Sequence, residues 1–172
     1  MHSMKFRAIC ALILLAINIA GFGQVKSSVP KFAGTWVLNR AKSEGLTGGL
    51  GDAEVRLIVT QDAKQLAAEQ KTIIRGREQP SREMSYKLDG SETEAEVVRP
   101  LAGTMKLTAR WIESSKTLEL HSTITGDNEG KPVTITTKEQ WQLIGKGNTL
   151  KIERTRHSPQ GTQTSKLIFE KQ

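Results

Sequence analysis

Hydrophobic and polar residues alternate along most of the chain from Thr35 onward, and the alternating segments are rich in Val, Ile, Thr and Leu. Alternation with a period of two is typical of β-strands that bury one side and expose the other. The pattern is clearest in residues 105–111, where every second residue is apolar. It predicts ten strands, over residues 34–39, 54–61, 65–74, 81–88, 92–99, 104–113, 117–125, 133–144, 149–157 and 163–171.

The connections between these segments are short and suited to tight reversals, for example at residues 62–64, 89–90, 145–148 and 158–161. Neighbouring strands are then antiparallel, because a parallel crossover needs about a dozen residues or more. Only residues 40–53 offer a connection of that length. The predicted fold class is therefore all-β, an antiparallel up-and-down meander closed into a barrel of about 8–10 strands. A two-sheet sandwich or a half-closed sheet is the alternative.

The first 23 residues predict a cleaved export signal. Lys5 and Arg7 precede an apolar run over residues 8–20, and small residues follow at Gly21 and Gly23. The run is too short for a membrane-spanning helix, which needs about 20 apolar residues. We expect cleavage after Gly23, a lead-in over residues 24–33 and no transmembrane segment in the mature chain. An uncleaved anchor is the alternative.

Removal of the leader would leave 149 residues without a cysteine, because Cys10 lies inside the leader. This is the usual size of one domain, so we expect residues 34–172 to form a single domain held by its core alone. The mature chain has 23 basic and 18 acidic residues, a formal net charge of +5, and the two signs are interleaved. It has six aromatic residues, too few for the stacking platforms of nucleic-acid recognition, so nucleic acid is not expected as a partner.

No catalytic constellation accompanies the strand pattern. His121 and His157 both fall on the predicted polar faces of their strands, so we expect them at the surface. The sequence lacks a nucleophile elbow for a reactive serine, and it lacks His, Cys and acidic residues at metal-ligand spacing. We therefore expect a protein with no catalytic residues, no metal and no cofactor, and an enzyme is the less favoured class.

Residues 32–36, Phe-Ala-Gly-Thr-Trp, stand at the start of the first predicted strand. Gly34 and Trp36 are similar to the Gly-x-Trp motif of the first lipocalin strand, and residues 39–43 and 158–161 are similar to short segments of uncharacterised bacterial relatives. The whole mature chain resembles the small lipocalin-like proteins that bacteria export. The resemblance implies a lipocalin-like (calycin) barrel that lies in the periplasm or outside the cell.

In lipocalins the motif tryptophan packs beneath a basic residue from the last strands and closes one end of the barrel. The resemblance implies this closing role for Gly34 and Trp36, with Arg154 as the candidate basic residue. A cation above an indole ring contributes about 0.5–2 kcal/mol. The alternative places Arg154 at the barrel rim, paired with Glu139 or Glu153.

The predicted interior is not purely apolar, and ligand pockets combine an apolar wall with a few placed polar groups. Candidates for lining a ligand are the inward-phased polar or aromatic residues Tyr86, Trp111, Thr137, Glu139 and Trp141. If no bulge turns Glu139 outward, Glu139 and Arg154 form a buried pair that orients a polar head group. The glycine-rich loop 45–51 is a candidate lid over the open mouth through Leu46 and Leu50, and a flexible connection is its alternative.

Two functions are compatible with these features. The leading one is non-catalytic binding of a small apolar or amphipathic molecule inside the barrel. The other is a solid-cored module that binds a protein or an anionic envelope polymer through its surface, and the sequence indicates no specific partner protein. The interior volume separates the two, because a void under about 100 Å³ favours the second and ligand pockets measure about 300 Å³ or more.

Overall fold

The computed structural model describes residues 29–98, 101–112 and 116–172, and it confirms the predicted all-β class. The predicted leader, residues 1–23, the first part of the lead-in, residues 24–28, and the predicted strand ends at residues 99 and 113 lie outside the described residues. The strands are β1 Gly34–Leu38, β2 Ala53–Gln61, β3 Gln65–Ile74, β4 Arg77–Glu78, β5 Arg82–Lys87, β6 Thr93–Val97, β7 Gly103–Ile112, β8 Thr117–Asn128, β9 Lys131–Ile144, β10 Thr149–Ser158 and β11 Gly161–Lys171.

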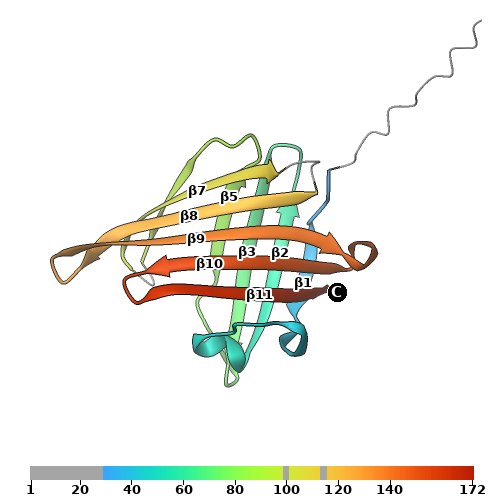
Figure 1. The fold of residues 1–172 in the computed structure, drawn as a ribbon, viewed down its shortest axis with the longest axis horizontal. Coiled ribbons are helices and arrows are strands. Elements are labelled where there is room, and N and C mark those ends of the chain that lie inside the picture. Colours follow the sequence, from blue (N-terminus) through green and yellow to red (C-terminus); the bar gives the residue numbers. More distant parts are fainter. Residues whose placement is uncertain (1–28, 99–100, 113–115) are drawn as a thin grey trace, which may run out of the picture.

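The strands form one antiparallel meander, in the order β4-β3-β2-β1-β11-β10-β9-β8-β7-β6, with β5 beside β3. The sheet folds over on itself into two layers (Figure 1). Strands β7 to β11 cross the front of the molecule, and β2, β3 and β5 run behind them at a steep angle. The interior lies between these layers.

The predicted closure of the barrel differs at one seam. Within the described residues no backbone ladder joins β5 to β6 or β7, and the seam is bridged by the Thr93 hydroxyl, which donates to the Ser85 carbonyl at 2.8 Å. The link over residues 88–92 carries the chain from one layer to the other, so that β5 stays on β3 while β6 pairs with β7. Exposed Glu94 and Glu96 mark β6 as a charged edge strand.

Two further differences concern the connections. The described residues form eleven strands rather than ten, because Arg75 and Gly76, both at positive φ, turn the chain back so that the two-residue strand β4 pairs with β3. The long connection after β1 contains two 3-10 turns, η1 Arg40–Lys42 and η2 Gly48–Gly51, and a third, η4 Gly145–Gly147, joins β9 to β10. In the described part of the chain, no helix is both long and apolar enough to cross a membrane.

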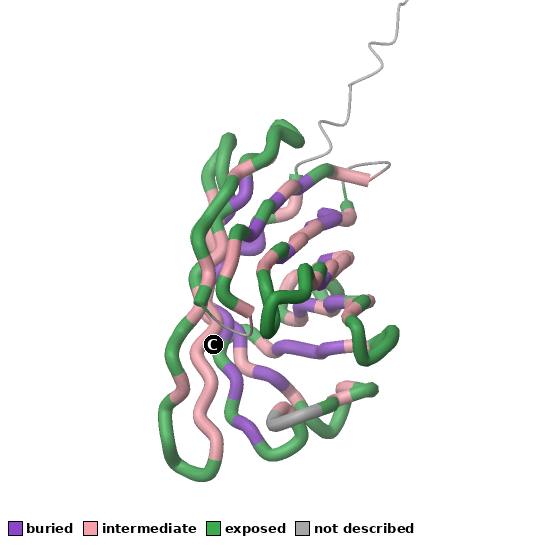
Figure 2. The backbone as a smooth tube through the Cα atoms, turned by 90° about the vertical axis from the view of Figure 1, so that its left-hand side faces the viewer, coloured by how far each residue is buried: buried purple, intermediate pink, exposed green. Residues whose placement is uncertain are grey.

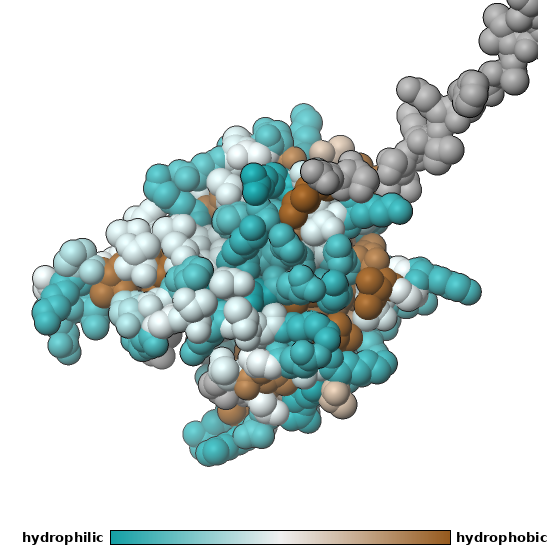
Figure 3. All heavy atoms as spheres, viewed as in Figure 1, coloured by the Kyte–Doolittle hydropathy of each residue, from teal (hydrophilic) through white to brown (hydrophobic). Residues whose placement is uncertain are grey.

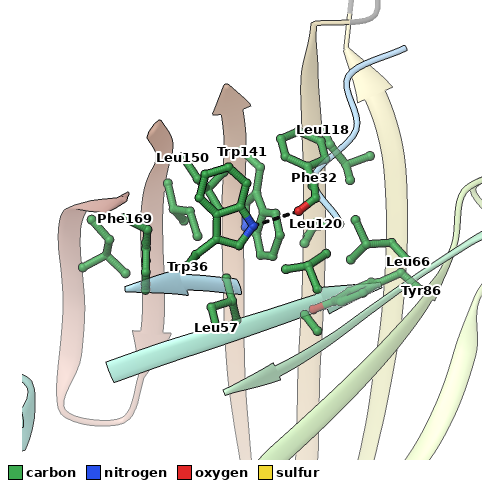
Figure 4. Packing of buried hydrophobic residues seen from close by; sticks show 14 of the residues in the cluster. Phe32, Trp36, Leu57, Leu66, Tyr86, Leu118, Leu120, Trp141, Leu150 and Phe169 are labelled. Carbon is green, nitrogen blue, oxygen red and sulfur yellow. Dashed lines mark hydrogen bonds between the residues drawn. The ribbon is translucent and has the colours of Figure 1, made fainter. Parts of the chain in front are cut away.

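The inward residues of the alternating pattern form the core. Figure 2 shows buried stretches along the strands and exposed residues in the turns that join them. The largest fully buried apolar side chains are Phe32, Trp36, Leu66, Met105, Leu107, Leu118, Leu120, Trp141, Leu150 and Ile152. The aromatic members Phe32, Trp36 and Trp141 lie close together in this core (Figure 4), and none of them lines the cavity described below.

Candidate ligand cavity

The packed end of the barrel is closed by Phe32, which precedes the first strand and is fully buried. Its ring stacks on Trp111, with 6.0 Å between ring centroids, and meets Trp141 edge-on at 5.7 Å. The indole N–H of Trp36 donates to the Phe32 carbonyl at 2.8 Å (Figure 4). The Phe32 amide donates to Gln61 Oε1 at 2.7 Å, which ties the lead-in to β2. Within the described residues, these side chains fill this end of the interior.

The prediction that Arg154 covers Trp36 is wrong. Lys171 Nζ lies 5.4 Å from the centroid of the Trp36 ring, and Arg154 lies opposite Ser165 on β11, six residues before Lys171. At about 3.3 Å per residue this is a separation of about 20 Å along the strand. Gly34 makes room for the lysine, because a Cβ at Gly34 would lie 3.0 Å from Lys171 Cε. A cation therefore lies over the Trp36 ring, and it is Lys171 rather than Arg154.

The other half of the interior holds a cavity of about 510 Å³. It is walled by β3, β5, β8, β9, β10 and β11 and by the loop 45–51. Hydroxyl and amide side chains form much of its wall, and its apolar part comes mainly from Leu50, Met84, Tyr86 and Leu120. The volume falls within the range of about 300–1,000 Å³ of small-molecule sites.

Glu139 points into this cavity, as its phase in β9 predicts, and it is only 7 % exposed. Its Oε1 accepts from Arg154 Nε at 2.6 Å, and its Oε2 accepts from the Trp141 indole N–H at 2.7 Å. A buried ion pair is tolerated when its remaining polar atoms are hydrogen-bonded, and both carboxylate oxygens meet this condition. Glu139 thus connects the aromatic closed end with the basic wall of the cavity.

Two more arginines line the cavity. Arg156 stands two residues after Arg154 on the same face of β10, and Arg82 faces them from β5. Burial lowers the pKa of Arg82, and the positive charges of Arg156 and Arg154 lower it further. Burial, followed by the charge of Arg154, also lowers the pKa of Arg156. Arginine nevertheless stays protonated in proteins, so all three guanidiniums contribute positive charge to the cavity.

Arg156 has no hydrogen bond or ion pair within the described part of the chain. Tyr86 is buried, and its hydroxyl donates to Met84 Sδ at 3.5 Å. Burial, followed by the negative charge of Glu139, raises the pKa of Tyr86, so this phenol remains a neutral donor in the cavity.

The loop 45–51 contributes Gly45, Thr47 and Leu50 to the wall of the cavity. Gly45 has φ of +66°, and a Cβ there would lie 2.4 Å from the Thr164 carbonyl oxygen, so only glycine allows this close approach to β11. The Thr47 hydroxyl lies 3.4 Å from Gln163 Oε1. Leu50 lines the cavity, whereas Leu46 packs against the core. Of the two residues proposed for a lid, only Leu50 is therefore part of the cavity wall.

The structure brings together some of the predicted lining residues and separates others. Tyr86, Thr137 and Glu139 line the cavity. Trp111 and Trp141 point inward as expected, but they belong to the packed end with Phe32. The roles of Arg82 and Phe32 were not predicted. Arg82 could have been predicted to point inward, because it alternates in step with Met84 and Tyr86. Phe32 could not, because it precedes the segments that alternate.

Most of the face seen in Figure 3 is hydrophilic or neutral, with scattered hydrophobic patches. Glu119 lies on this face of β8 and is still only 1 % exposed. Its Oε1 accepts from Arg110 Nε at 2.7 Å and lies 3.0 Å from His121 Nε2, and its Oε2 accepts from Lys138 Nζ at 2.7 Å and from Gln140 Nε2 at 3.1 Å. Burial alone would raise the pKa of the Glu119 carboxyl, but the hydrogen bonds from Lys138 and the other donors hold it well below its ordinary value.

His121 and His157, the two histidines among the described residues, both lie at the surface. His121 belongs to the Glu119 cluster, and His157 Nδ1 lies 2.8 Å from the Thr162 hydroxyl. Across residues 29–98, 101–112 and 116–172, no group of three or more His, Cys, Asp or Glu side chains is placed to hold a metal ion. A second hollow of about 640 Å³, more open to solvent than the cavity, lies on the outer face beside Glu44, Lys138 and Lys166.

No known protein family and no curated protein matches this chain. Among solved structures, the crystal structure of zebrafish ileal bile acid-binding protein complexed with cholic acid aligns with it. The alignment covers 82 % of this chain and 98 % of that one, with 13 % sequence identity and a TM-score of 0.48. A similarity this distant supports no inference about a ligand.

Proposed function

We propose that this chain is an exported, non-catalytic lipocalin-like protein of the periplasm or extracellular space, and that it binds a small amphipathic anion in its interior cavity. The observation that carries the proposal is the cavity itself, about 510 Å³ in volume, with an apolar patch and more cations than anions on its wall. A protein whose interior is filled by side chains would have no cavity of this size. The volume is large enough for a ligand, because small-molecule sites measure about 300 Å³ or more.

The lining supports one orientation of the ligand. Its apolar part would pack on Leu50, Met84 and Leu120, and its anionic end would bind Arg156, whose donors are unused by the described residues. Arginine donors match carboxylate, sulfonate and phosphate groups well because they form a planar fork. Since the Phe32 end is packed, the ligand would enter past the loop 45–51.

The test compares two fluorescent probes with the same ring skeleton. 1-Anilinonaphthalene-8-sulfonate is an anion, and N-phenyl-1-naphthylamine lacks the sulfonate. We expect one molecule of the sulfonate to bind per chain, more tightly than the neutral probe. Arg156→Gln should weaken sulfonate binding about ten-fold, the equivalent of about 1.4 kcal/mol. Arg56→Gln, an exposed residue of β2, is the matched control and should leave it unchanged. Equal binding by wild type and Arg156→Gln would contradict the proposal.

The role of the Glu139 and Arg154 pair is tested separately with Glu139→Gln. This change removes the carboxylate that holds Arg154 and accepts the Trp141 N–H. We expect the free energy of unfolding to fall by about 1–3 kcal/mol and the affinity for a fluorescent fatty acid to change. Unchanged stability together with unchanged uptake would show that the pair does not orient a head group.

Export is tested by expressing the full chain in a bacterium and fractionating the cells. We expect the protein in the periplasm or medium with Gln24 at its N-terminus, because the small residues that favour cleavage of a leader end at Gly23. Recovery of an uncleaved chain from the membrane fraction would support the anchor instead.

A further inference from the structure

The interior side chains of β8, β9 and β10 become more polar along the strands. The backbone register places them in three successive rows, each of which crosses from strand to strand. The first row consists of Leu118, Trp141 and Ile152, the second of Leu120, Glu139 and Arg154, and the third of Ser122, Thr137 and Arg156. The first row is buried in the core, whereas the second and third rows line the cavity. The third row, here the polar row, carries only hydrogen-bonding side chains.

The polar row has hydrogen-bonding groups that the described residues do not use. The side chains of Ser122, Thr137 and Arg156 form no hydrogen bond or ion pair with any other described residue. Within the same part of the chain, no fully buried side-chain nitrogen or oxygen lacks a hydrogen-bond partner. The two hydroxyls are therefore open to the cavity space rather than sealed inside the wall. In the second row, by contrast, Glu139 accepts from Arg154 Nε at 2.6 Å.

A ligand that consists of an acidic group and an apolar chain alone does not suit the polar row. An apolar chain packed on Ser122 and Thr137 would take both hydroxyls out of water without giving them a partner, which is unfavourable. Neighbouring strands lie about 4.8 Å apart, so the backbones of Ser122 and Arg156 are separated by about 10 Å. A head group with hydrogen-bonding groups at several places fits a row of this width. Hydroxyls match serine and threonine well, because each of these groups both donates and accepts.

From the polar row we infer that the ligand carries hydroxyl groups beside its acidic group, as a sugar acid linked to an apolar chain does. The acidic group would bind Arg156, and the hydroxyls would pair with Thr137 and Ser122. The apolar part would lie on Leu120 of the second row and on Met84 of β5. The inference rests on the proposed function and narrows the class of ligand for the same cavity.

The experiment compares two synthetic ligands by isothermal titration calorimetry, each below its critical micelle concentration. Octyl β-D-glucuronide has an octyl chain and a six-membered ring that carries a carboxylate and hydroxyls. In cis-3-octyloxycyclohexanecarboxylate the chain and the carboxylate are placed in the same way, but the ring carries no hydroxyl. We expect octyl glucuronide to bind about ten-fold more tightly, although it is the less hydrophobic ligand. Equal affinities, or a preference for the ring without hydroxyls, would overturn the inference.

Substitutions at Thr137 show whether the preference comes from the polar row. Thr137→Val removes the hydroxyl and should reduce the preference to about three-fold or less, mainly by weakening the binding of octyl glucuronide. Thr137→Ser keeps a hydroxyl and should retain more of the preference. Thr134→Val, at an exposed position of the same strand, is the matched control and should keep it in full. A preference that Thr137→Val leaves intact, or an equal loss of affinity for both ligands, would overturn the inference.

Failure of the inference is distinguishable from failure of the proposed function. If 1-anilinonaphthalene-8-sulfonate binds and Arg156→Gln weakens it, but octyl glucuronide shows no preference or no binding, only the inference is overturned. If the sulfonate and both octyl ligands fail to bind, the proposed function is overturned as well.

Discussion

Removal of the Phe32 ring should destabilise the whole barrel, although this residue lies outside every strand. The side chain is fully buried and contacts Trp111 and Trp141, and its carbonyl accepts the Trp36 indole N–H. Truncation of a buried phenylalanine to alanine costs about 3–5 kcal/mol, through lost burial and the cavity left behind. We expect Phe32→Ala to fall in this range, which is a large part of the 5–15 kcal/mol typical of a domain.

The assay is equilibrium unfolding in urea, followed by far-UV circular dichroism and by tryptophan fluorescence. Val29→Ala is the matched control, because Val29 belongs to the same lead-in and is 46 % exposed. We expect this control to stay within about 0.5 kcal/mol of the wild type. If Phe32→Ala lost less than about 1 kcal/mol, far below the usual cost of such a truncation, the lead-in would not close the barrel.

Two other stability predictions follow from the outer face and the loop. Glu119→Gln should lower the free energy of unfolding by about 1–3 kcal/mol, because the cations around this buried carboxylate lose their charged acceptor. Glu94→Gln on the exposed edge strand is the control and should change the free energy of unfolding little. Because the pKa of Glu119 is lowered in the folded state, the carboxylate stabilises the fold above the ordinary pKa of 4.5, and this stabilisation is lost as the pH falls below that value. The free energy of unfolding, measured in urea from pH 6 to pH 2, should therefore fall less steeply with pH in Glu119→Gln than in the wild type. Equal slopes for the two proteins would argue against this. Gly45→Ala should lower the free energy of unfolding by more than about 1 kcal/mol, because Gly45 has a positive φ and a Cβ there would collide with the Thr164 carbonyl. Gly51→Ala is the control and should change it by less than about 0.5 kcal/mol, because the space around Gly51 is open. Similar melting temperatures for both variants in calorimetry would show that Gly45 does not anchor the loop.

The strands were predictable because alternation records which side chains face the interior. Short connections then left an antiparallel meander as the simplest topology, and the structure confirms it. The alternating pattern along the strands did not by itself show which cation lies over the Trp36 ring. Arg154 and Lys171 both belong to late strands, and only the register of β10 on β11 and of β11 on β1 decides which one reaches Trp36.

The candidate site was predictable in part for the same reason. Phase placed Tyr86, Thr137 and Glu139 inward, and they line the cavity. Phase also placed Trp141 inward, but it does not show whether an inward position meets a void or packed side chains. That depends on which end of the barrel is filled, and Phe32 fills it from a segment without periodicity.

Intermolecular nuclear Overhauser effects from the aromatic protons of 1-anilinonaphthalene-8-sulfonate to methyl groups of the protein test most directly whether the ligand lies inside the barrel. With methyl-labelled protein, we expect contacts to Leu50, Met84 and Leu120, which line the cavity. Contacts confined to the exposed Ile144 and Val98 would place the probe on the surface and contradict interior binding.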